Sequence, residues 1–502
     1  MKQIDILYVN PNGANIIYQE LANDYSAIEP PIWAALLAQH TRSKGFTTAI
    51  LDCEAERLNL VDSANKVLSF NPRLIVMISM GQQPSASSQN MSGLSRLARK
   101  LKDICPECKI AFMGAHPSTL CRETLMKEKC DFVIQGEGTK TLDALCLCPD
   151  LDDPNELDKV PSLWFRKGIF IRFTPFAEPI AQSDLPTELP GMAWDLLPME
   201  KYRTANWHAL SNNNEKQPFA SLYTSLGCVY SCKFCMINAN FGNNNVENAK
   251  GKPSFRYWDT DFIMTQFDEI AKRGIRNVKL ADEMMILYPE HYSSIFRKIV
   301  ERGYDFNIWC YSRLNTIDEG YLPLMRQAGV SWVALGIEAA DANVRKNVIK
   351  GNFKDVKIVE VVRKIQDAGI NVIGNFIFGL PEDNLETMQA TLDLATELNC
   401  EFSNFYSAIC YPGSTLYLEG LQDKIEMPDS YEAYSQHSYE CFPMHTNFIS
   451  NKEVLAFRDK AFMLYFTNEK YLKMVEAKFG IKAREEIEKM TKTKLKRKLL
   501  GD

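Results

Sequence analysis

The sequence lacks every feature that would place it in or across a membrane. No stretch approaches the roughly 20 apolar residues of a membrane span. The first residues, MKQIDILYVNP, lack the basic flank and long apolar run of a signal peptide. A basic cluster is missing until KTKLKRK near the end, which we interpret as a solvated helix end rather than a nucleic-acid site. Internal repeats and low-complexity tracts are absent as well. We therefore expect a cytoplasmic protein without a membrane span or a nucleic-acid partner.

The overall composition is that of a globular protein, and cysteine is the informative residue type. The chain has 502 residues, of which 46% are hydrophobic and 24% are charged, with a net charge of -6. It has 14 cysteines, and without an export signal these indicate a reducing compartment where thiols stay free or hold metal. Cys105 and Cys108 read C-x2-C, but they follow a predicted helix and have no partner ligands nearby, so we interpret them as incidental.

Residues 1–145 alternate short apolar runs with amphipathic segments. The apolar runs are IDILYVNP, TTAILDC, RLIVMISM, KIAFMGA and DFVIQGEG. Buried strands that alternate with helices at this spacing predict a Rossmann-like parallel sheet with helices on both faces. The first strand is not followed by G-x-G-x-x-G, so the usual dinucleotide site is not expected.

Ligands of such sheets bind beyond the carboxyl ends of the strands. The polar and glycine-rich residues at those ends predict a ligand site. They are Asn10, Pro11, Ser79, Gln82, Gln83, Gly114, Ala115, His116, Pro117, Gly136, Glu137 and Gly138.

The rest of the chain predicts a linker, a second α/β domain and a helical end. Residues 146–215 are rich in Pro and Asp, and SLWFRKGIFIRF predicts a short hairpin within this linker. Residues 216–425 contain six further strand-like runs with helices between them, which predict a partial (β/α)6 barrel. Residues 426–502 are aromatic-rich and then strongly helical, and they predict a small capping region.

Three cysteines follow the first run of the second series. Cys228, Cys232 and Cys235 read C-x3-C-x2-C in CVYSCKFC. Three thiolates can hold a [4Fe–4S] cluster by three irons, which leaves the fourth iron open to a substrate or cofactor. A zinc site with a distant fourth ligand and three incidental thiols are the alternatives. The position at the carboxyl end of a barrel strand favours the cluster.

This loop resembles that of the radical S-adenosylmethionine superfamily, and residues from about 218 to 425 resemble its core domain. The resemblance implies that the open iron binds S-adenosylmethionine, whose cleavage gives a 5′-deoxyadenosyl radical. It also implies contacts to that cofactor from the cysteine loop and from residues at the ends of several strands. These are Phe234, Asp282, Glu283, Ser312, Arg313, Glu338, Asn375 and Tyr411. Asp282 and Glu283 could instead cap a helix, and polar residues line any barrel mouth.

Residues 1–140 resemble the cobalamin-binding domain that precedes the radical domain in one large subgroup. The resemblance rests on YVNPNG, EPPIWAALLAQHTRSKGFTTAILD, GAHPSTL and DFVIQGEGTKTL. It implies cobalamin at the strand ends named above. No D-x-H-x-x-G motif is present, so we expect cobalamin without a histidine ligand to cobalt, its lower face covered by the loop that contains Gln82 and Gln83. An empty sheet kept for packing is the alternative.

Two adjacent cofactor domains imply a methyltransferase. Methylcobalamin would give its methyl group to a radical on an unactivated carbon of a small-molecule substrate. A radical cyclase or oxidoreductase on the same scaffold is the first alternative, and a non-catalytic cobalamin or redox sensor is the second. The resemblance also implies an external electron donor of the flavodoxin or ferredoxin type. The sequence names neither the substrate nor a general acid or base.

Overall fold

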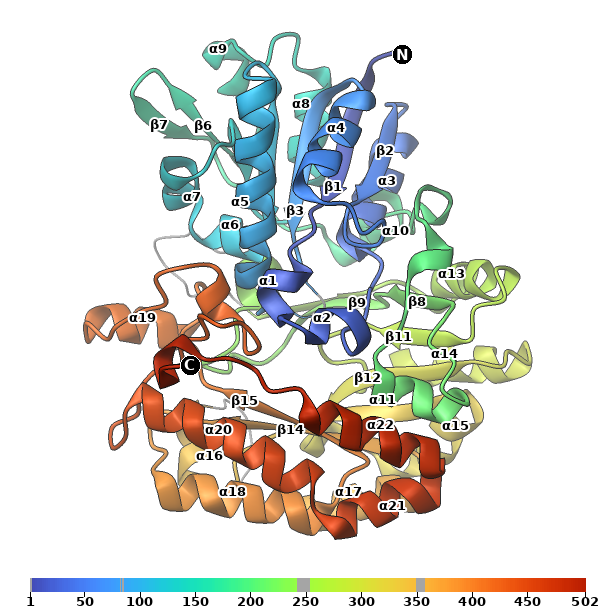
Figure 1. The fold of residues 1–502 in the computed structure, drawn as a ribbon. Coiled ribbons are helices and arrows are strands. Elements are labelled where there is room, and N and C mark those ends of the chain that lie inside the picture. The colour runs from blue at the N-terminus through green and yellow to red at the C-terminus, as the bar shows by residue number, and fades with distance from the viewer. Residues whose placement is uncertain (1, 82, 84, 242–252, 349–356) are drawn as a thin grey trace.

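Two large, mainly parallel sheets, stacked one above the other in Figure 1, form the framework of the molecule. The computed structural model describes residues 2–81, 83, 85–241, 253–348 and 357–502. The sheets belong to an N-terminal and a C-terminal α/β domain, as the alternating sequence pattern predicts. Among the described helices, none is long and apolar enough to cross a bilayer.

The N-terminal sheet has seven strands in the order β2-β1-β3-β4-β5-β6-β7. Their bounds are β1 Ile4–Asn10, β2 Thr48–Asp52, β3 Pro72–Ser79, β4 Ile110–Gly114, β5 Phe132–Ile134, β6 Leu163–Lys167 and β7 Phe170–Phe173. The first five strands are parallel and match the five predicted runs. The predicted hairpin, β6–β7, also forms, and it extends this sheet antiparallel to β5.

Successive side chains of a strand point to opposite faces of the sheet. Both faces of this sheet are apolar, and helices cover both. Ile6 and Tyr8 pack in one core, whereas Leu7 and Val9 pack in another. The helices are α3 Ile32–Ser43, α4 Leu60–Ser69, α5 Ala86–Ile104, α6 Ala115–Thr119, α7 Cys121–Lys127 and α8 Thr139–Leu147. Shorter helices precede and follow them: α1 Ala14–Tyr18, α2 Leu21–Asp24, α9 Pro154–Leu157 and α10 Leu185–Glu188.

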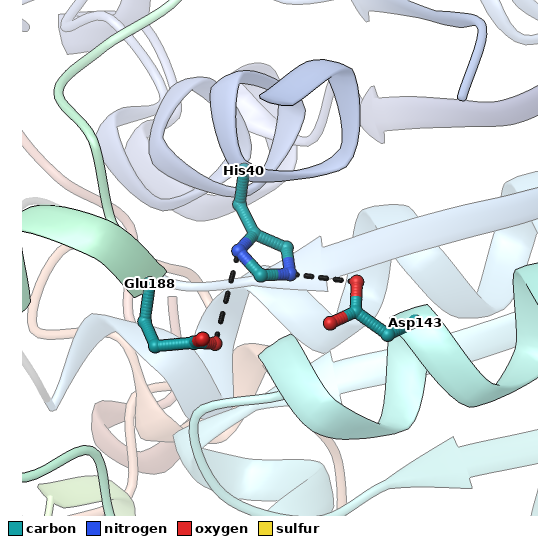
Figure 2. A group of neighbouring side chains, drawn as sticks. All are labelled: His40, Asp143 and Glu188. Carbon is teal, nitrogen blue, oxygen red and sulfur yellow. Dashed lines mark hydrogen bonds and ion pairs between the residues drawn. The ribbon is translucent and has the colours of Figure 1, made fainter. Parts of the chain in front are cut away.

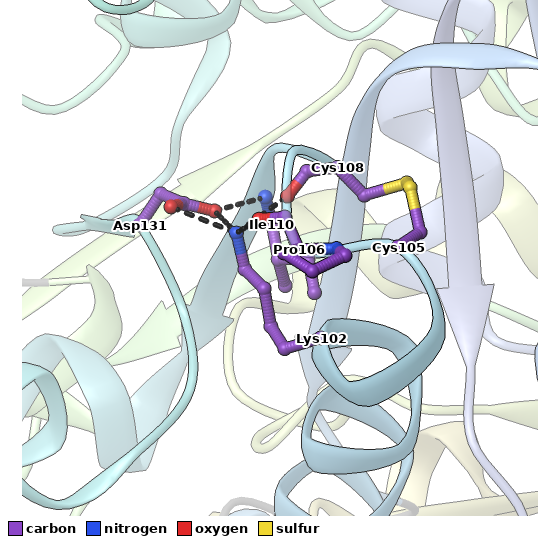
Figure 3. Close-up of a disulfide and its surroundings, with 6 residues drawn as sticks. All are labelled: Lys102, Cys105, Pro106, Cys108, Ile110 and Asp131. Atoms are coloured by element: carbon purple, nitrogen blue, oxygen red, sulfur yellow. Dashed lines mark hydrogen bonds and ion pairs between the residues drawn. A yellow bond between two sulfur atoms is a disulfide. The ribbon is translucent and has the colours of Figure 1, made fainter.

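The C-x2-C pair corrects the expectation that all thiols are free or hold metal. Cys105 and Cys108 form a disulfide in the turn between α5 and β4 (Figure 3). Lys102 Nζ donates hydrogen bonds to the carbonyls of Pro106 and Cys108 at 3.1 and 2.6 Å, and it pairs with Asp131. The turn thereby brings the two thiols together, which residue spacing alone does not reveal. The remaining 12 cysteines form no disulfide within the described part of the chain.

The C-terminal sheet has six parallel strands in the order β15-β14-β13-β12-β11-β8, which is the predicted partial barrel. The bounds are β8 Phe219–Leu222, β11 Asn277–Leu280, β12 Asn307–Arg313, β13 Val330–Glu338, β14 Asn371–Phe378 and β15 Phe402–Ser407. The first predicted strand divides in two. Its second half, β9 Ser225–Cys228, leaves the barrel and pairs antiparallel with β10 Ser254–Tyr257.

Helices surround the barrel and form its C-terminal cap. Those between the strands are α11 Asn206–Ala209, α12 Asn238–Phe241, α13 Thr260–Lys272, α14 Pro289–Glu301, α15 Leu322–Gln327, α16 Ala342–Val348, α17 Ile358–Asp367 and α18 Leu385–Leu398. Those that follow are α19 Thr415–Gln422, α20 Asn451–Phe466, α21 Glu469–Phe479 and α22 Ile481–Lys492. One hydrophobic core runs through both domains and the cap.

The basic end of the chain is not a solvated helix end, contrary to the prediction. Helix α22 stops at Lys492, and residues 493–502, which we call the strap, fold back between the two domains (Figure 1). Arg497 is 1% exposed and binds both carboxylate oxygens of Asp459 at 2.9 and 3.0 Å. The side-chain amide of Gln19 bonds both the N–H and the carbonyl of Lys496. A partly buried carboxylate, Asp459, therefore binds one cation of the basic cluster, Arg497.

Candidate functional site

The three-cysteine loop follows β9 and is held by the ends of two helices. Lys233, within the loop, donates its N–H to the carbonyl of Val348 at 2.8 Å and accepts from Leu416 N–H at 2.9 Å. Cys228 is 9% exposed, and the other two thiols are partly buried. Burial raises the pKa of Cys228 to about 12 and raises that of Cys235 as well. Thiols in such surroundings ionise when a positive metal offsets the lost hydration.

Asp282 determines where the chain leaves the barrel. Its carboxylate is fully buried and accepts from the Thr224 N–H at 3.0 and 3.1 Å, from Thr224 Oγ1 at 2.7 Å and from Ser225 Oγ at 2.5 Å. Gly227, at φ +86°, then lets β9 approach β10, because a Cβ there would lie 2.2 Å from the Ser254 carbonyl. The structure thus engages Asp282 with the start of the cysteine loop, and its predicted contact with S-adenosylmethionine stays a prediction.

Two other acids at the carboxyl ends of the barrel strands are less fully engaged. Glu283 and Glu338 are both partly buried. Burial raises the pKa of Glu283 to about 8, which Lys279 opposes, and it raises the pKa of Glu338 to about 7, which Arg313 opposes. The Arg313 guanidinium lies 3.8 Å from the ring centroid of Tyr230, inside the cysteine loop. The cation is therefore stacked over the loop.

The remaining predicted contacts to S-adenosylmethionine are dispersed. Ser312 is buried and bonds Thr316 at 3.0 Å. Phe234 packs in a small apolar cluster at the ends of β13 to β15. Asn375 and Tyr411 line a large cavity.

That cavity, of about 570 Å³, lies between the two domains, and we call it the larger cavity. The N-terminal domain contributes Tyr18, Glu29, Gln83, Ser85, Ala86 and Gln89. The barrel contributes Lys279, Trp309, Tyr311, Asn375, Asn404 and Tyr406, and the strap lines it as well. Trp207 packs edge-on against Trp309 and Trp332 with ring centroids 5.0 and 5.4 Å apart, which fills the lower end of the barrel. The larger cavity is therefore closed below by aromatic rings.

A second cavity of about 70 Å³ lies at the carboxyl ends of β1 and β3, and we call it the smaller cavity. Asn10, Pro11 and Gly81 line it, together with Trp33, whose indole N–H has no hydrogen-bond partner among the described residues. Tyr18, Glu29 and Ala86 line both cavities. The two cavities thus share a wall.

Of the residues predicted to bind cobalamin, only Asn10, Pro11 and Gln83 line one of these two cavities. Gln82 lies outside the described residues. The other predicted residues line neither of these two cavities. They are Ser79, Gly114, Ala115, His116, Pro117, Gly136, Glu137 and Gly138. Ser79 bonds the Ser87 carbonyl at 2.5 Å, and Glu137 bonds Arg256 at 2.5 Å.

His116 is buried away from both cavities. Its Nδ1 lies 3.0 Å from Ser88 Oγ, and its ring packs edge-on against Tyr431, 5.4 Å between centroids. Burial lowers its pKa to about 3, so the imidazole is neutral. Tyr431 belongs to the aromatic-rich start of the predicted capping region. This segment bridges the two domains, because Tyr434 packs near both His116 and Tyr411.

One histidine and two carboxylates lie together like the ligands of a metal site, but their geometry does not suit one ion. His40, Asp143 and Glu188 lie together on α3, α8 and α10 (Figure 2). Asp143 is 2.8 Å from His40 Nε2, whereas Glu188 is 3.9 Å from Nδ1 on the other side of the ring. The two carboxylates therefore do not converge on one point, and Lys44 pairs with Glu188 at 3.3 Å. The group is an ion-paired contact between helices.

Sequence reasoning named Gln83, Asn375 and Tyr411 but missed most of the other residues that line the larger cavity. Glu29 and Lys279 form a buried ion pair at 2.9 Å across the domain boundary. Neither belongs to a motif, and the only signal was their position: Glu29 precedes a Pro-Pro helix start, and Lys279 interrupts an apolar strand.

The comparisons with known proteins agree with this geometry. The B12 binding domain profile matches residues 21–146, and the Radical SAM superfamily profile matches residues 222–395. The chain belongs to the cobalamin-dependent radical S-adenosylmethionine enzymes. An uncharacterized methyltransferase of Pyrococcus horikoshii is 25% identical over 440 residues, 87% of each chain. The anaerobic magnesium-protoporphyrin IX monomethyl ester cyclase of Rubrivivax gelatinosus is 23% identical over 485 residues, which is 93% of this chain and 80% of the cyclase.

A solved structure shares the whole arrangement. The radical S-adenosylmethionine methyltransferase TsrM of Kitasatospora setae, with cobalamin and a [4Fe–4S] cluster bound, superposes with a TM-score of 0.62 at 17% identity. The match covers 87% of this chain and 82% of TsrM. At this identity the likeness concerns the fold.

The residues present fit both cofactors of the family. Cys228, Cys232 and Cys235 form no disulfide and lie on one loop at the carboxyl end of the barrel, which suits a [4Fe–4S] cluster. The smaller cavity, at about 70 Å³, admits only part of a group as large as cobalamin, so the fit rests on that cavity together with the adjoining part of the larger cavity. The N–H of Trp33, in the lining of the smaller cavity, lacks a partner among the described residues. No histidine lines the smaller cavity.

Proposed function

We propose that this enzyme transfers a methyl group to an unactivated carbon of a small molecule bound in the larger cavity. The observation that carries the proposal is the shared wall: Tyr18, Glu29 and Ala86 line both the larger cavity and the smaller cavity. When bound, the cluster with S-adenosylmethionine supplies a 5′-deoxyadenosyl radical, and cobalamin supplies the methyl group. Group transfer between neighbouring sites requires reacting atoms within a few ångströms of each other.

The residues of this chain orient the cysteine loop, place a cation beside it and limit the access of water to the larger cavity. Asp282 orients the cysteine loop through Thr224 and Ser225. Arg313 places a cation beside that loop, where it suits the carboxylate of an amino-acid cofactor. The aromatic rings below and the strap above line the larger cavity and limit the access of water, which protects a radical from side reactions.

The predicted residue roles enter the proposal with different support. Glu283, Glu338, Asn375 and Tyr411 are the acceptors and backbone proposed to contact S-adenosylmethionine, and Phe234 and Ser312 are proposed contacts without a described link to them. Asn10, Pro11 and Gln83 are the cobalamin contacts with direct access to a cavity. An external donor of the flavodoxin or ferredoxin type supplies electrons, and a reducing cytoplasm is the compartment that preserves such a cluster.

Product analysis tests the proposal. Reconstituted enzyme with reductant, substrate and trideuteromethyl-labelled S-adenosylmethionine should give one 5′-deoxyadenosine and one S-adenosylhomocysteine per turnover, with the label on a carbon of the product. Formation of 5′-deoxyadenosine over several turnovers without S-adenosylhomocysteine would contradict methyl transfer.

That second outcome would support a radical cyclase or oxidoreductase. This alternative is retained because of the coverage of the cyclase of Rubrivivax gelatinosus, which matches 93% of this chain.

A further inference from the structure

The ion pair of Glu29 and Lys279 stands at the wall shared by the two cavities. Lys279, on β11, is 1% exposed, and its Nζ lies 2.9 and 3.2 Å from the two carboxylate oxygens of Glu29. Glu29 reaches this point from the N-terminal domain, just before α3. Both residues line the larger cavity, and Glu29 lines the smaller cavity as well.

A second buried ion pair joins the same two domains without lining the larger cavity. Arg256, on β10, binds Glu137 at 2.5 Å, and both side chains are at most 10% exposed. Arg256 also donates to the carbonyl of Ile180 at 2.6 Å, and Glu137 accepts from the Ile180 N–H at 2.7 Å. This pair is enclosed by its own backbone partners, so its role is to join the domains.

The surroundings of Lys279 are those of a binding surface. Its ammonium lies 4.8 Å from the ring centroid of Trp309 and 5.7 Å from that of Tyr311. On the opposite wall, Asn404 donates to Asn375 at 2.9 Å. Flat rings and neutral amides therefore surround one self-neutralised ion pair. At the upper end, Arg458 and Arg497 share the single carboxylate of Asp459, so that group carries an excess positive charge, unlike the pair of Glu29 and Lys279.

The charge balance determines which ligand this arrangement accepts. A buried carboxylate and ammonium in contact cancel each other, and an additional ion beside them would leave a net charge out of water, at a cost of several kcal/mol. A neutral amide or hydroxyl offers a donor to Glu29 and an acceptor to Lys279 without that cost. The aromatic side chains suit a conjugated ring attached to such a group.

We propose that Glu29 and Lys279 select the substrate: an uncharged molecule with a flat ring and a neutral amide or hydroxyl group that meets this ion pair. The proposal rests on the proposed function, because it takes the larger cavity as the substrate site. Its test measures binding, so it can fail while methyl transfer holds.

Three probes with one ring and different charge provide the test. They are 2-naphthamide, 2-naphthoate and 2-(aminomethyl)naphthalene, which are neutral, anionic and cationic at pH 7. Equilibrium dialysis is done anaerobically with enzyme carrying cluster and cobalamin. We expect 2-naphthamide to bind at least about tenfold more tightly than either ion, which corresponds to about 1.4 kcal/mol. Tighter binding of an ion, or no binding of any probe, overturns the proposal.

Charge variants separate selection from a purely structural role. Glu29→Gln leaves Lys279 in excess and should make 2-naphthoate the tightest probe. Lys279→Gln leaves Glu29 in excess and should make 2-(aminomethyl)naphthalene the tightest. The double variant is neutral again and should restore the preference for 2-naphthamide, which keeps the test valid if a single variant folds poorly. Arg256→Lys, in the enclosed pair, is the matched control and should not change the order. An order that is the same in all variants contradicts the proposal.

Discussion

The carboxyl ends of the two sheets differ in how many of their polar side chains are already bonded within the protein. In the N-terminal sheet, the polar groups are mostly bonded within the protein: Asn10 to Asp52, Ser79 to Ser87 and Glu137 to Arg256. At the barrel end, three thiols on one loop form no disulfide, and Glu283 carries a raised pKa. The comparison indicates that the barrel presents side chains to its cofactor, whereas the N-terminal sheet offers mainly shape and backbone.

The barrel end should therefore be the part that mutation disables most completely. Changing Cys228, Cys232 and Cys235 together to Ala should abolish the cluster and the reductive cleavage of S-adenosylmethionine, because no other described thiol lies on this loop. Iron content should fall from about four per chain to background, as measured by iron assay and electron paramagnetic resonance.

The control for this variant is Cys105→Ser with Cys108→Ser, which removes two cysteines far from the barrel and should keep the cluster. Residual cleavage in the triple variant would contradict the assignment.

Substitutions of the neighbouring acids Asp282 and Glu283 should affect the iron content differently. Asp282→Asn removes one acceptor from a buried network, which should cost about 2 kcal/mol of stability and lower the iron content by misplacing the loop. Glu283→Gln should leave iron content unchanged, because no loop residue depends on it for a described hydrogen bond. Equal iron loss in both variants would show that Asp282 has no special positioning role.

Glu283 should also give a pH-dependent signal in the cluster-free protein. Its pKa is raised from 4.5 to about 8, mainly by burial, so the folded protein disfavours the ionised form. The resulting penalty is absent below about pH 4.5 and grows as pH rises towards 8. Glu283→Gln should therefore melt at a higher temperature than the parent protein at pH 8.5, and the gain should vanish near pH 4.5. A gain that is independent of pH would refute the assigned cause.

At the N-terminal end, removing a histidine should leave cobalt coordination unchanged. His116→Ala should lower stability by about 2 kcal/mol, because Ser88 and Tyr431 lose a partner. The spectrum of reduced cobalt should not change. Nitrogen hyperfine coupling from a protein imidazole in the parent enzyme, lost in the variant, would show that this end does supply a cobalt ligand.

Among these substitutions, one in the strap should have the smallest effect on global stability. Arg497→Met removes the bonds to Asp459, which keeps Arg458 as a partner, so global stability should change little. Thermolysin should cleave residues 493–500 roughly tenfold faster, which corresponds to about 1.4 kcal/mol of local stability. Lys498→Met, which breaks only the exposed pair with Glu440, is the control and should cleave at the parent rate.

The sequence predicted the strands and the cysteine loop, because these depend on local patterns. Apolar runs at strand spacing predicted all five parallel strands of the first sheet and the six of the barrel. The pair Glu29 and Lys279 is separated by 250 residues in the sequence, and nothing local marks it. The hydrogen bonds of Asp282 likewise appear only once β8 and β11 lie side by side.

The central claim is that both cofactor ends face one shared space, and spin coupling tests it most directly. Enzyme loaded with cobalamin is reduced so that the cluster and Co(II) are both paramagnetic. The account predicts that each signal is broadened or split by the other, and that the effect on cobalt disappears in the triple cysteine variant. Two independent, unperturbed signals in fully loaded enzyme would contradict it.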